Sequence, residues 1–392
     1  MRKNIIVSAL LLILTCSTAY AQLGEDGYYR VQNTATKRYV GIIHNRSETQ
    51  VMTGNADLRA LCAYKDWSWV ESDPATIIYI EKMHSGTTAG KNYYACNLYG
   101  QGTNTKSITN YDINIMDIGG KYRCWVVYNG TFYLSERSIY SSAKTNKLET
   151  NNRDTWNWNI LPVSSAGSCY FGVKPTVEAQ GKYYATMYAD WGFTPASSST
   201  KAYYVEKVAN GCAVIREITG EVPAKTPVIF ECAGEKAVDN KLDIARNNAK
   251  LPTANKLSGV YFNINSGSTF HKDSVAYDPA TMRLLGVCSD GRPGFVKKSK
   301  EDFIVPDEFW SFMAHGIPAN TAYLVVPEGT PDELPLVTAE EYAVGIDDVT
   351  MSPATSSDVV TLSGVVVKRN ATSAEGLPSG IYIWNKRKIV VR

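Results

Sequence analysis

Two short motifs place tryptophans beside polar residues in a spacing that could bind a sugar. They read Asp66-Trp67-Ser68-Trp69 and Asp154-Thr155-Trp156-Asn157-Trp158. In a β-strand, alternate residues face the same side, so both tryptophans of each motif would share a face. One would pack in a core, and the other could stack on a sugar ring while nearby polar groups bind its hydroxyls. The candidate ligand-binding residues are Asp66, Trp67, Asp154, Trp156 and Asn157. The alternative, that all four tryptophans are structural, stays open.

Catalytic motifs are missing from the sequence. The histidines form no H-E-x-x-H pattern, and there is no G-x-S-x-G or G-x-x-x-x-G-K-[ST] sequence. Cys288 could act as a nucleophile only if the fold placed His271 or His315 beside it as a base. The acidic pairs at 340–341 and 347–348 fall in expected linkers. The sequence therefore predicts no catalytic residue, no cofactor and no metal site, and it favours a protein that is not an enzyme.

Charge and composition narrow the class of protein. Lys and Arg number 40 against 38 Asp and Glu, a net charge of +2, which does not favour nucleic-acid binding. The 25 tyrosines and 29 glycines, with few long helical patterns, predict an all-β protein.

Residues 1–21 have the pattern of a signal peptide. Arg2 and Lys3 precede an apolar run over 5–14, and Ala19-Tyr20-Ala21 is a cleavage signal. A lipoprotein signal ending at Cys16 is the rival interpretation. No later stretch approaches 18 apolar residues, so no transmembrane segment is expected.

The cysteines do not form a disulfide framework. Cys16 would leave with the signal peptide, and the seven that remain of eight are scattered and contain no C-x-x-C pair. Cys212 and Cys232 are a candidate pair across neighbouring strands.

Three predicted hairpins organise residues 22–166. Alternating aromatic and β-branched residues on either side of polar turns carry this prediction. The strand pairs are 28–32 with 39–43, 76–80 with 93–98, and 121–127 with 131–134. Their spacing is a repeat of roughly 45 residues, too long for leucine-rich repeats. The sequence Gly27-Tyr-Tyr-Arg-Val-Gln-Asn33, with Arg38-Tyr-Val40 and the tryptophans at 69 and 158, resembles the ricin-type β-trefoil family. That resemblance implies a trefoil-like domain able to bind carbohydrate.

A small polar stretch at 164–168 is expected to link this domain to a second all-β domain, residues 167–338. Two similar segments, 222–229 and 317–324, each begin with a proline turn before a buried strand. Together with Tyr184-Ala-Thr-Met-Tyr188 and Gly294-Phe-Val296, their order resembles a β-sandwich accessory domain of secreted Bacteroidetes proteins. This resemblance implies a non-catalytic module.

The last section, 345–392, has its own strand pattern. Its residues Leu377-Pro-Ser-Gly-Ile-Tyr-Ile383 and the basic run 386–388 before a final strand resemble the C-terminal sorting domain of the Bacteroidetes type IX secretion family. The resemblance implies export to the outer-membrane surface or the extracellular space, with the periplasm as an alternative.

We therefore expect a secreted or surface-displayed, non-catalytic protein that binds glycan or another surface ligand. A secreted hydrolase, or a protease inhibitor on a β-trefoil scaffold, is the alternative. The sequence does not reveal the ligand or the oligomeric state.

Overall fold

The computed structural model describes residues 23, 26–42, 61–64, 67–82, 93–96, 113–127, 131–136, 148–150, 153–189, 191–245, 251, 254–260, 275–303, 316–344, 357–362, 364–384 and 387–391. These residues are nearly all β, as the composition predicts. None of the helices in this part of the chain has the length and apolar character needed to cross a bilayer. The expected signal peptide, 1–21, lies outside the described residues.

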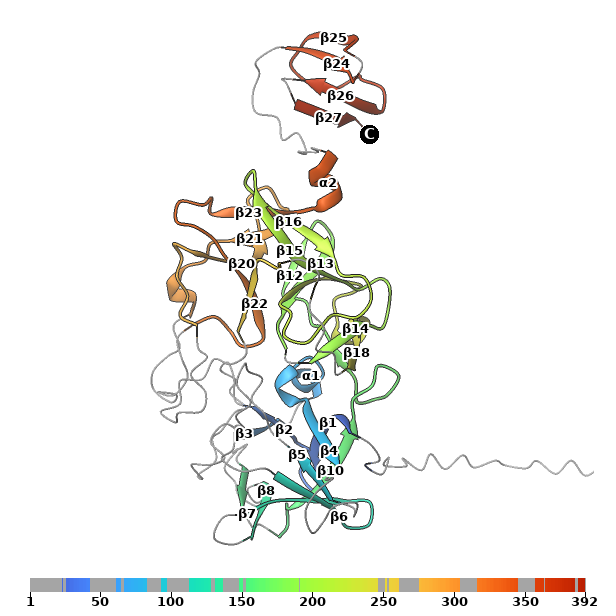
Figure 1. Ribbon diagram of the computed structural model, residues 1–392, viewed down its shortest axis with the longest axis vertical. Helices are drawn as coiled ribbons and strands as arrows, with labels where there is room; N and C mark the ends of the chain where they lie inside the picture. The colour runs from blue at the N-terminus through green and yellow to red at the C-terminus, as the bar shows by residue number, and fades with distance from the viewer. Residues whose placement is uncertain are drawn as a thin grey trace, which may run out of the picture.

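The first unit is built from ten described strands, drawn in blue to green in Figure 1. They are β1 (Gly27–Asn33), β2 (Tyr39–Ile42), β3 (Leu61–Tyr64), β4 (Ile78–Lys82), β5 (Tyr93–Cys96), β6 (Ile113–Asp117), β7 (Tyr122–Val127), β8 (Thr131–Glu136), β9 (Leu148–Thr150) and β10 (Asn157–Pro162). Antiparallel pairing runs from β1 through β4, β5, β6, β7 and β10 and returns to β1. The three expected hairpins are confirmed as β1–β2, β4–β5 and β7–β8.

Strand β1 is buried on both of its faces. Tyr29, Val31 and Asn33 alternate with Arg30, and all four are buried. Because neighbours along a strand point to opposite sides, Arg30 faces away from the side that carries Val31. The segments that cover Arg30 come from α1 (Trp67–Val70) and from the start of the second unit. One strand therefore contributes to the interior of the first unit and to its junction with the second.

The second unit contains a ten-stranded sheet and a three-stranded sheet. The large sheet has the order β12-β13-β17-β15-β16-β23-β21-β20-β22-β19, and the small one β11-β18-β14. The strands are β11 (Phe171–Gly172), β12 (Val177–Ala179), β13 (Lys182–Met187), β14 (Gly192–Pro195), β15 (Lys201–Ala209), β16 (Cys212–Glu217), β17 (Val228–Cys232), β18 (Lys241–Ala245), β19 (Leu257–Val260), β20 (Met282–Val287), β21 (Pro293–Val296), β22 (Thr321–Val325) and β23 (Glu333–Thr338). The strands expected near 183–188, 202–208, 212–218, 228–232, 259–264, 283–287 and 322–326 correspond to seven of these, with the end of the 259–264 segment outside the described residues.

The large sheet wraps around one core. Val205, Ile229, Phe295 and Leu324 belong to the same buried cluster, although they lie on strands from both halves of the strand order. The two ends also contact each other directly, since the main-chain N–H of Ala322 donates to the hydroxyl of Thr186. The sheet is joined in its middle by β23, which pairs in parallel with β16 and antiparallel with β21.

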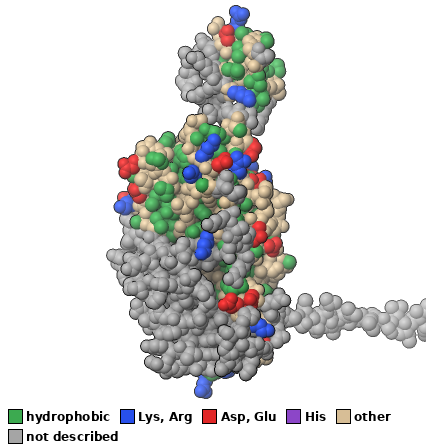
Figure 2. Space-filling model, in the orientation of Figure 1, with side chains coloured by type: hydrophobic (Ala, Val, Ile, Leu, Met, Phe, Trp, Pro, Cys, Tyr) green, Lys and Arg blue, Asp and Glu red, His purple; other side chains and the backbone are tan. Residues whose placement is uncertain are grey.

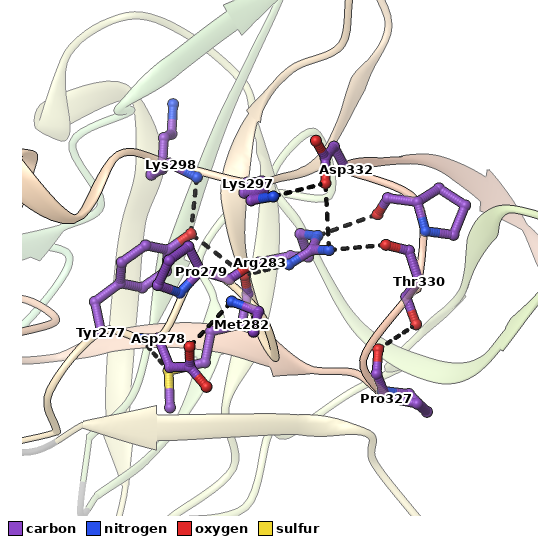
Figure 3. Close-up of polar contacts among 12 residues, drawn as sticks. Tyr277, Asp278, Pro279, Met282, Arg283, Lys297, Lys298, Pro327, Thr330 and Asp332 are labelled. Atoms are coloured by element: carbon purple, nitrogen blue, oxygen red, sulfur yellow. Dashed lines mark hydrogen bonds and ion pairs between the residues drawn. The ribbon is translucent and has the colours of Figure 1, made fainter.

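A buried arginine ties together the turns beside β20 and β23 (Figure 3). Arg283, 2% exposed, donates to the carbonyls of Pro279, Thr330 and Pro331 at 2.9–3.1 Å. A carboxylate oxygen of Asp332 lies 3.7 Å from the Arg283 guanidinium and 3.2 Å from the Lys297 ammonium group. Since buried carbonyls without a partner are costly, Arg283 fixes this end of the sheet.

The candidate Cys212–Cys232 disulfide is wrong. Both thiols are free. Strand β15 separates the two strands that carry them, and they lie at its opposite ends: Cys212 is opposite Ala209, whereas Glu231, next to Cys232, is opposite Lys201.

The C-terminal unit is a four-stranded sheet with the order β25-β24-β26-β27, drawn at the top of Figure 1. It consists of β24 (Ser357–Thr361), β25 (Val366–Ala371), β26 (Gly380–Trp384) and β27 (Arg387–Val391), and follows the helix α2 (Ala339–Val344). Val359, Tyr382, Trp384 and Ile389 form its own small core. Figure 2 shows hydrophobic side chains on the described surface of this unit, consistent with the exposure of Leu362 and of Val365–Val367.

Candidate ligand-binding site

Trp156 lies at the end of the first unit, just before β10 begins. The ring is half-buried, while Trp158, two residues on, is fully buried against the interior with Tyr122 opposite it on β7. The expectation that one tryptophan of this motif packs in a core is confirmed. Trp156 is the member left near the surface.

Two arginines surround the Trp156 ring. The guanidinium carbon of Arg123 lies 4.2 Å from the ring centre and that of Arg153 lies 5.9 Å from it. Arg123 reaches the ring because the β7–β10 register places it opposite Asn157. A guanidinium near an indole face is attracted by the negative charge of the ring face. Arg123 contacts the indole from the neighbouring strand β7, and Arg153 from the segment just before β10.

The backbone around Trp156 is fixed by the turn that follows β1. Asn33, which is fully buried, donates from its side-chain amide to the carbonyl of Thr155 at 2.6 Å. Its side-chain oxygen accepts from the main-chain N–H groups of Ala35 and Thr36. The N–H of Thr34 then donates to the carbonyl of Asn157 at 2.9 Å. A site at Trp156 is therefore built on two paired segments, which limits its motion.

Three polar residues of different charge lie next to Trp156 in the chain. Arg153 and Asp154 are exposed, and Asn157 is half-buried. Within the described residues, the side-chain oxygen of Asn157 is buried and has no hydrogen-bond partner. The cluster thus combines an aromatic ring, a guanidinium donor and a carboxylate acceptor at the surface. This set of groups could bind a ring-shaped polar ligand such as a sugar.

The first motif has a different environment. Trp67 begins the short helix α1, so the expectation that Trp67 and Trp69 lie in a strand is wrong. Its ring packs against Tyr39 and Tyr170, each at 5.6 Å, and lies 5.2 Å from the Arg30 guanidinium. Asp66 lies outside the described residues, as does the side chain of Trp69. Asp154, Trp156 and Asn157 therefore lie on one short segment at the start of β10, and Trp67 lies at the junction of two units.

Arg30 organises that junction. It donates to the Thr76 hydroxyl at 2.9 Å, to the Val70 carbonyl at 2.7 Å and to the Tyr170 carbonyl. Burial lowers the pKa of the Arg30 guanidinium, and the nearby Cys169 partly offsets that effect. Nearby, the N–H of Gly172 donates to the Glu71 carbonyl at 2.9 Å. The groups around Trp67 are thus occupied in joining the two units.

The described residues give no support to a cysteine nucleophile. Burial raises the pKa of the Cys288 thiol to about 11, so it is protonated at neutral pH, whereas a nucleophile acts as thiolate. His271 and His315, its candidate partners, lie outside the described residues, as do His44 and His84. Among the residues described, no group of three or more His, Cys, Asp or Glu side chains could hold a metal ion.

Sequence reasoning did not identify Arg123 or Arg153 as site residues. Arg153 directly precedes Asp154, so its position next to the motif was a usable signal. Arg123 could be found only from the pairing of β7 with β10, which brings together residues far apart in the chain.

A scan of the chain against protein-family models finds no match. A comparison with curated proteins also finds none. Function must therefore be inferred from the residues of the site and their geometry.

Proposed function

We propose that this chain is an exported, non-catalytic protein that binds glycan at a cell surface or outside the cell. The observation that carries the proposal is the half-buried Trp156 ring, held by Arg123 and flanked by Arg153 and Asp154. An aromatic face covers the apolar side of a sugar ring, and charged groups around it bond the hydroxyls. Trp67 is the weaker candidate because its ring lies among Arg30, Tyr39 and Tyr170 at the junction of the two units.

We also propose that the first unit is a β-trefoil-like domain of the ricin type. The closed circuit of antiparallel strands and the three hairpins support this proposal. In such a domain each hairpin pair contributes loops near one axis, so binding sites can recur. A single tryptophan platform binds weakly, and display of many copies at a surface would raise the effective affinity.

The other two units fit the same proposal. The second is proposed to be a sandwich-like accessory module, supported by the large sheet that wraps around one core. The third is proposed to be a sorting-type domain, supported by the four-stranded sheet with its own core.

The test is glycan-array binding by the mature chain, residues 22–392, beside two variants. Trp156→Ala should lose binding while its circular dichroism spectrum and melting temperature stay close to those of the parent chain. Tyr342→Ala, which removes an aromatic ring from α2 in the second unit, is the matched control and should bind as the parent does.

Two results would overturn the proposal. If folded Trp156→Ala binds glycans as strongly as the parent chain, Trp156 is not the platform. If the parent chain binds no glycan but inhibits a protease or hydrolyses a substrate, the protein belongs to the alternative class.

A further inference from the structure

The charges beside Trp156 indicate what kind of sugar it would bind. Both charged side chains that lie over its ring among the described residues, Arg123 and Arg153, are arginines, and Asp154 stands between Arg153 and Trp156 in the chain. The chain as a whole is nearly neutral, with 40 basic and 38 acidic residues, so a preference for acidic ligands would have to come from side chains at the site.

Arg153 is placed to contact a ligand. It is exposed, and its guanidinium lies 5.9 Å from the centre of the Trp156 ring. A guanidinium that interacts with a ring face does so through its charge, and its five N–H donors lie in its own plane, pointing outward. Those donors match the spacing of the oxygens in a carboxylate or sulfate group.

Asp154 and Arg153 would divide the contacts between them. A carboxylate accepts hydrogen bonds and so suits sugar hydroxyls, whereas a guanidinium only donates and suits an acidic substituent. The guanidinium carbon of Arg123 lies closer to the ring, 4.2 Å from its centre, and this contact fixes the orientation of the indole.

We infer that the Trp156 site selects acidic sugars, in which a carboxylate or sulfate group on the ring that stacks on Trp156 is bound by Arg153. This inference rests on the proposed glycan-binding function and deepens it by naming the class of sugar. Arg153 is then the residue that determines specificity, and Trp156 supplies affinity for the ring itself.

The experiment compares neutral and acidic forms of one sugar. Immobilised N-acetyllactosamine, its sialylated form and its 6-sulfated form are titrated with the mature chain. The sialylated form carries a carboxylate and the sulfated form a sulfate, so the two arms distinguish the acid group. The acidic forms should bind about tenfold more tightly than the neutral parent, as expected for one charged hydrogen-bonding group at a surface. The preference should shrink as salt is added.

Substitutions at Arg153 give the decisive comparison. Arg153→Gln keeps a polar side chain with an N–H₂ donor, but it is shorter and carries no charge, so it should bind all three forms with the affinity of the neutral sugar. Arg153→Lys keeps the charge but loses the planar fork, so it should retain part of the preference.

Two sets of results would contradict these proposals, and they distinguish failure of the selectivity from failure of glycan binding. If the parent chain binds neutral and acidic forms equally, or if Arg153→Gln keeps the full preference, the inference is wrong while glycan binding at Trp156 stands. If no form binds in a Trp156-dependent way, the proposed function fails, and the selectivity fails with it.

Discussion

The guanidinium of Arg30 donates a hydrogen bond to the main-chain carbonyl of Tyr170, although the two residues are 140 positions apart in the chain. The same guanidinium also holds the carbonyl of Val70 in α1. Ile77, from the first unit, lies in the buried cluster that contains Phe171 and Trp191 of the second. The two units therefore share buried polar and apolar contacts, and their stabilities are expected to be coupled.

We predict that Arg30→Ala lowers the free energy of unfolding by about 2–4 kcal/mol, because it leaves buried carbonyls without donors. Urea denaturation of a protein consisting of residues 22–392 measures this change. Arg216→Ala is the matched control: its guanidinium pairs with Glu206 on an exposed face, and its loss should leave the free energy of unfolding close to that of the parent chain. Equal stability of the two variants would show that Arg30 does not hold the junction.

Removal of the Trp67 ring should lower the stability of the protein more than removal of the Trp156 ring. Trp67→Ala removes a ring packed against Tyr39, Tyr170 and Arg30, and should lower stability by about 2 kcal/mol or more. Trp156→Ala should cost only about 1 kcal/mol, the scale of a cation–π contact. Thermal melts of both variants make the comparison, and a Trp156→Ala chain that fails to fold would make Trp156 a core residue.

Buried thiols should weaken the fold at alkaline pH. Burial raises the pKa of Cys124 and of Cys232 from an ordinary value of 9.0 to about 12. Between those values the unfolded chain releases protons that the folded chain retains, so stability is intact below pH 9 and falls as pH rises above it. For fully buried Cys124 the loss is about 1.4 kcal/mol per pH unit in that window.

The measurement is urea unfolding of the reduced chain at pH 7, 9 and 10. Cys124→Ala should show a shallower decline between pH 9 and pH 10 than the parent chain. An identical decline in both proteins would mean that Cys124 is not responsible for it.

The C-terminal unit should be separable from the rest of the chain. Because β24–β27 enclose their own core, deletion of residues 345–392 should leave the melting of the remaining chain unchanged. If the unit sorts the protein, the shortened chain should accumulate in the periplasm of the producing bacterium, as cell fractionation would show. Unchanged display at the cell surface would mean that the unit has no sorting role.

Strand positions could be predicted from sequence because alternation at a period of two is a local property. Strands β1, β2, β15 and β17 were all visible in this way, since aromatic and β-branched residues alternate or cluster between polar turns. The boundary at 164–168 stays a prediction: these residues form an exposed turn in which the N–H of Gly167 donates to the carbonyl of Ser164.

The helix at Trp67 and the arginines at Trp156 could not be predicted, because tertiary contacts decide both. Trp67-Ser-Trp69 has the alternation of a strand, yet four residues form a helical turn that contacts Arg30 and Tyr170. Arg123 reaches Trp156 only through the register of β7 with β10, and a shift of one residue would turn it to the other face.

The position of β23 has a consequence for how the chain is made. β16 is complete at residue 217, but its parallel partner β23 begins only at residue 333. A ribosome must therefore produce more than a hundred further residues before this edge is covered, and a truncated product would expose the edges of both β16 and β21. Exposed edges invite pairing between chains, so prematurely terminated copies should aggregate. Such a chain is expected to complete this sheet only once its full length has left the ribosome.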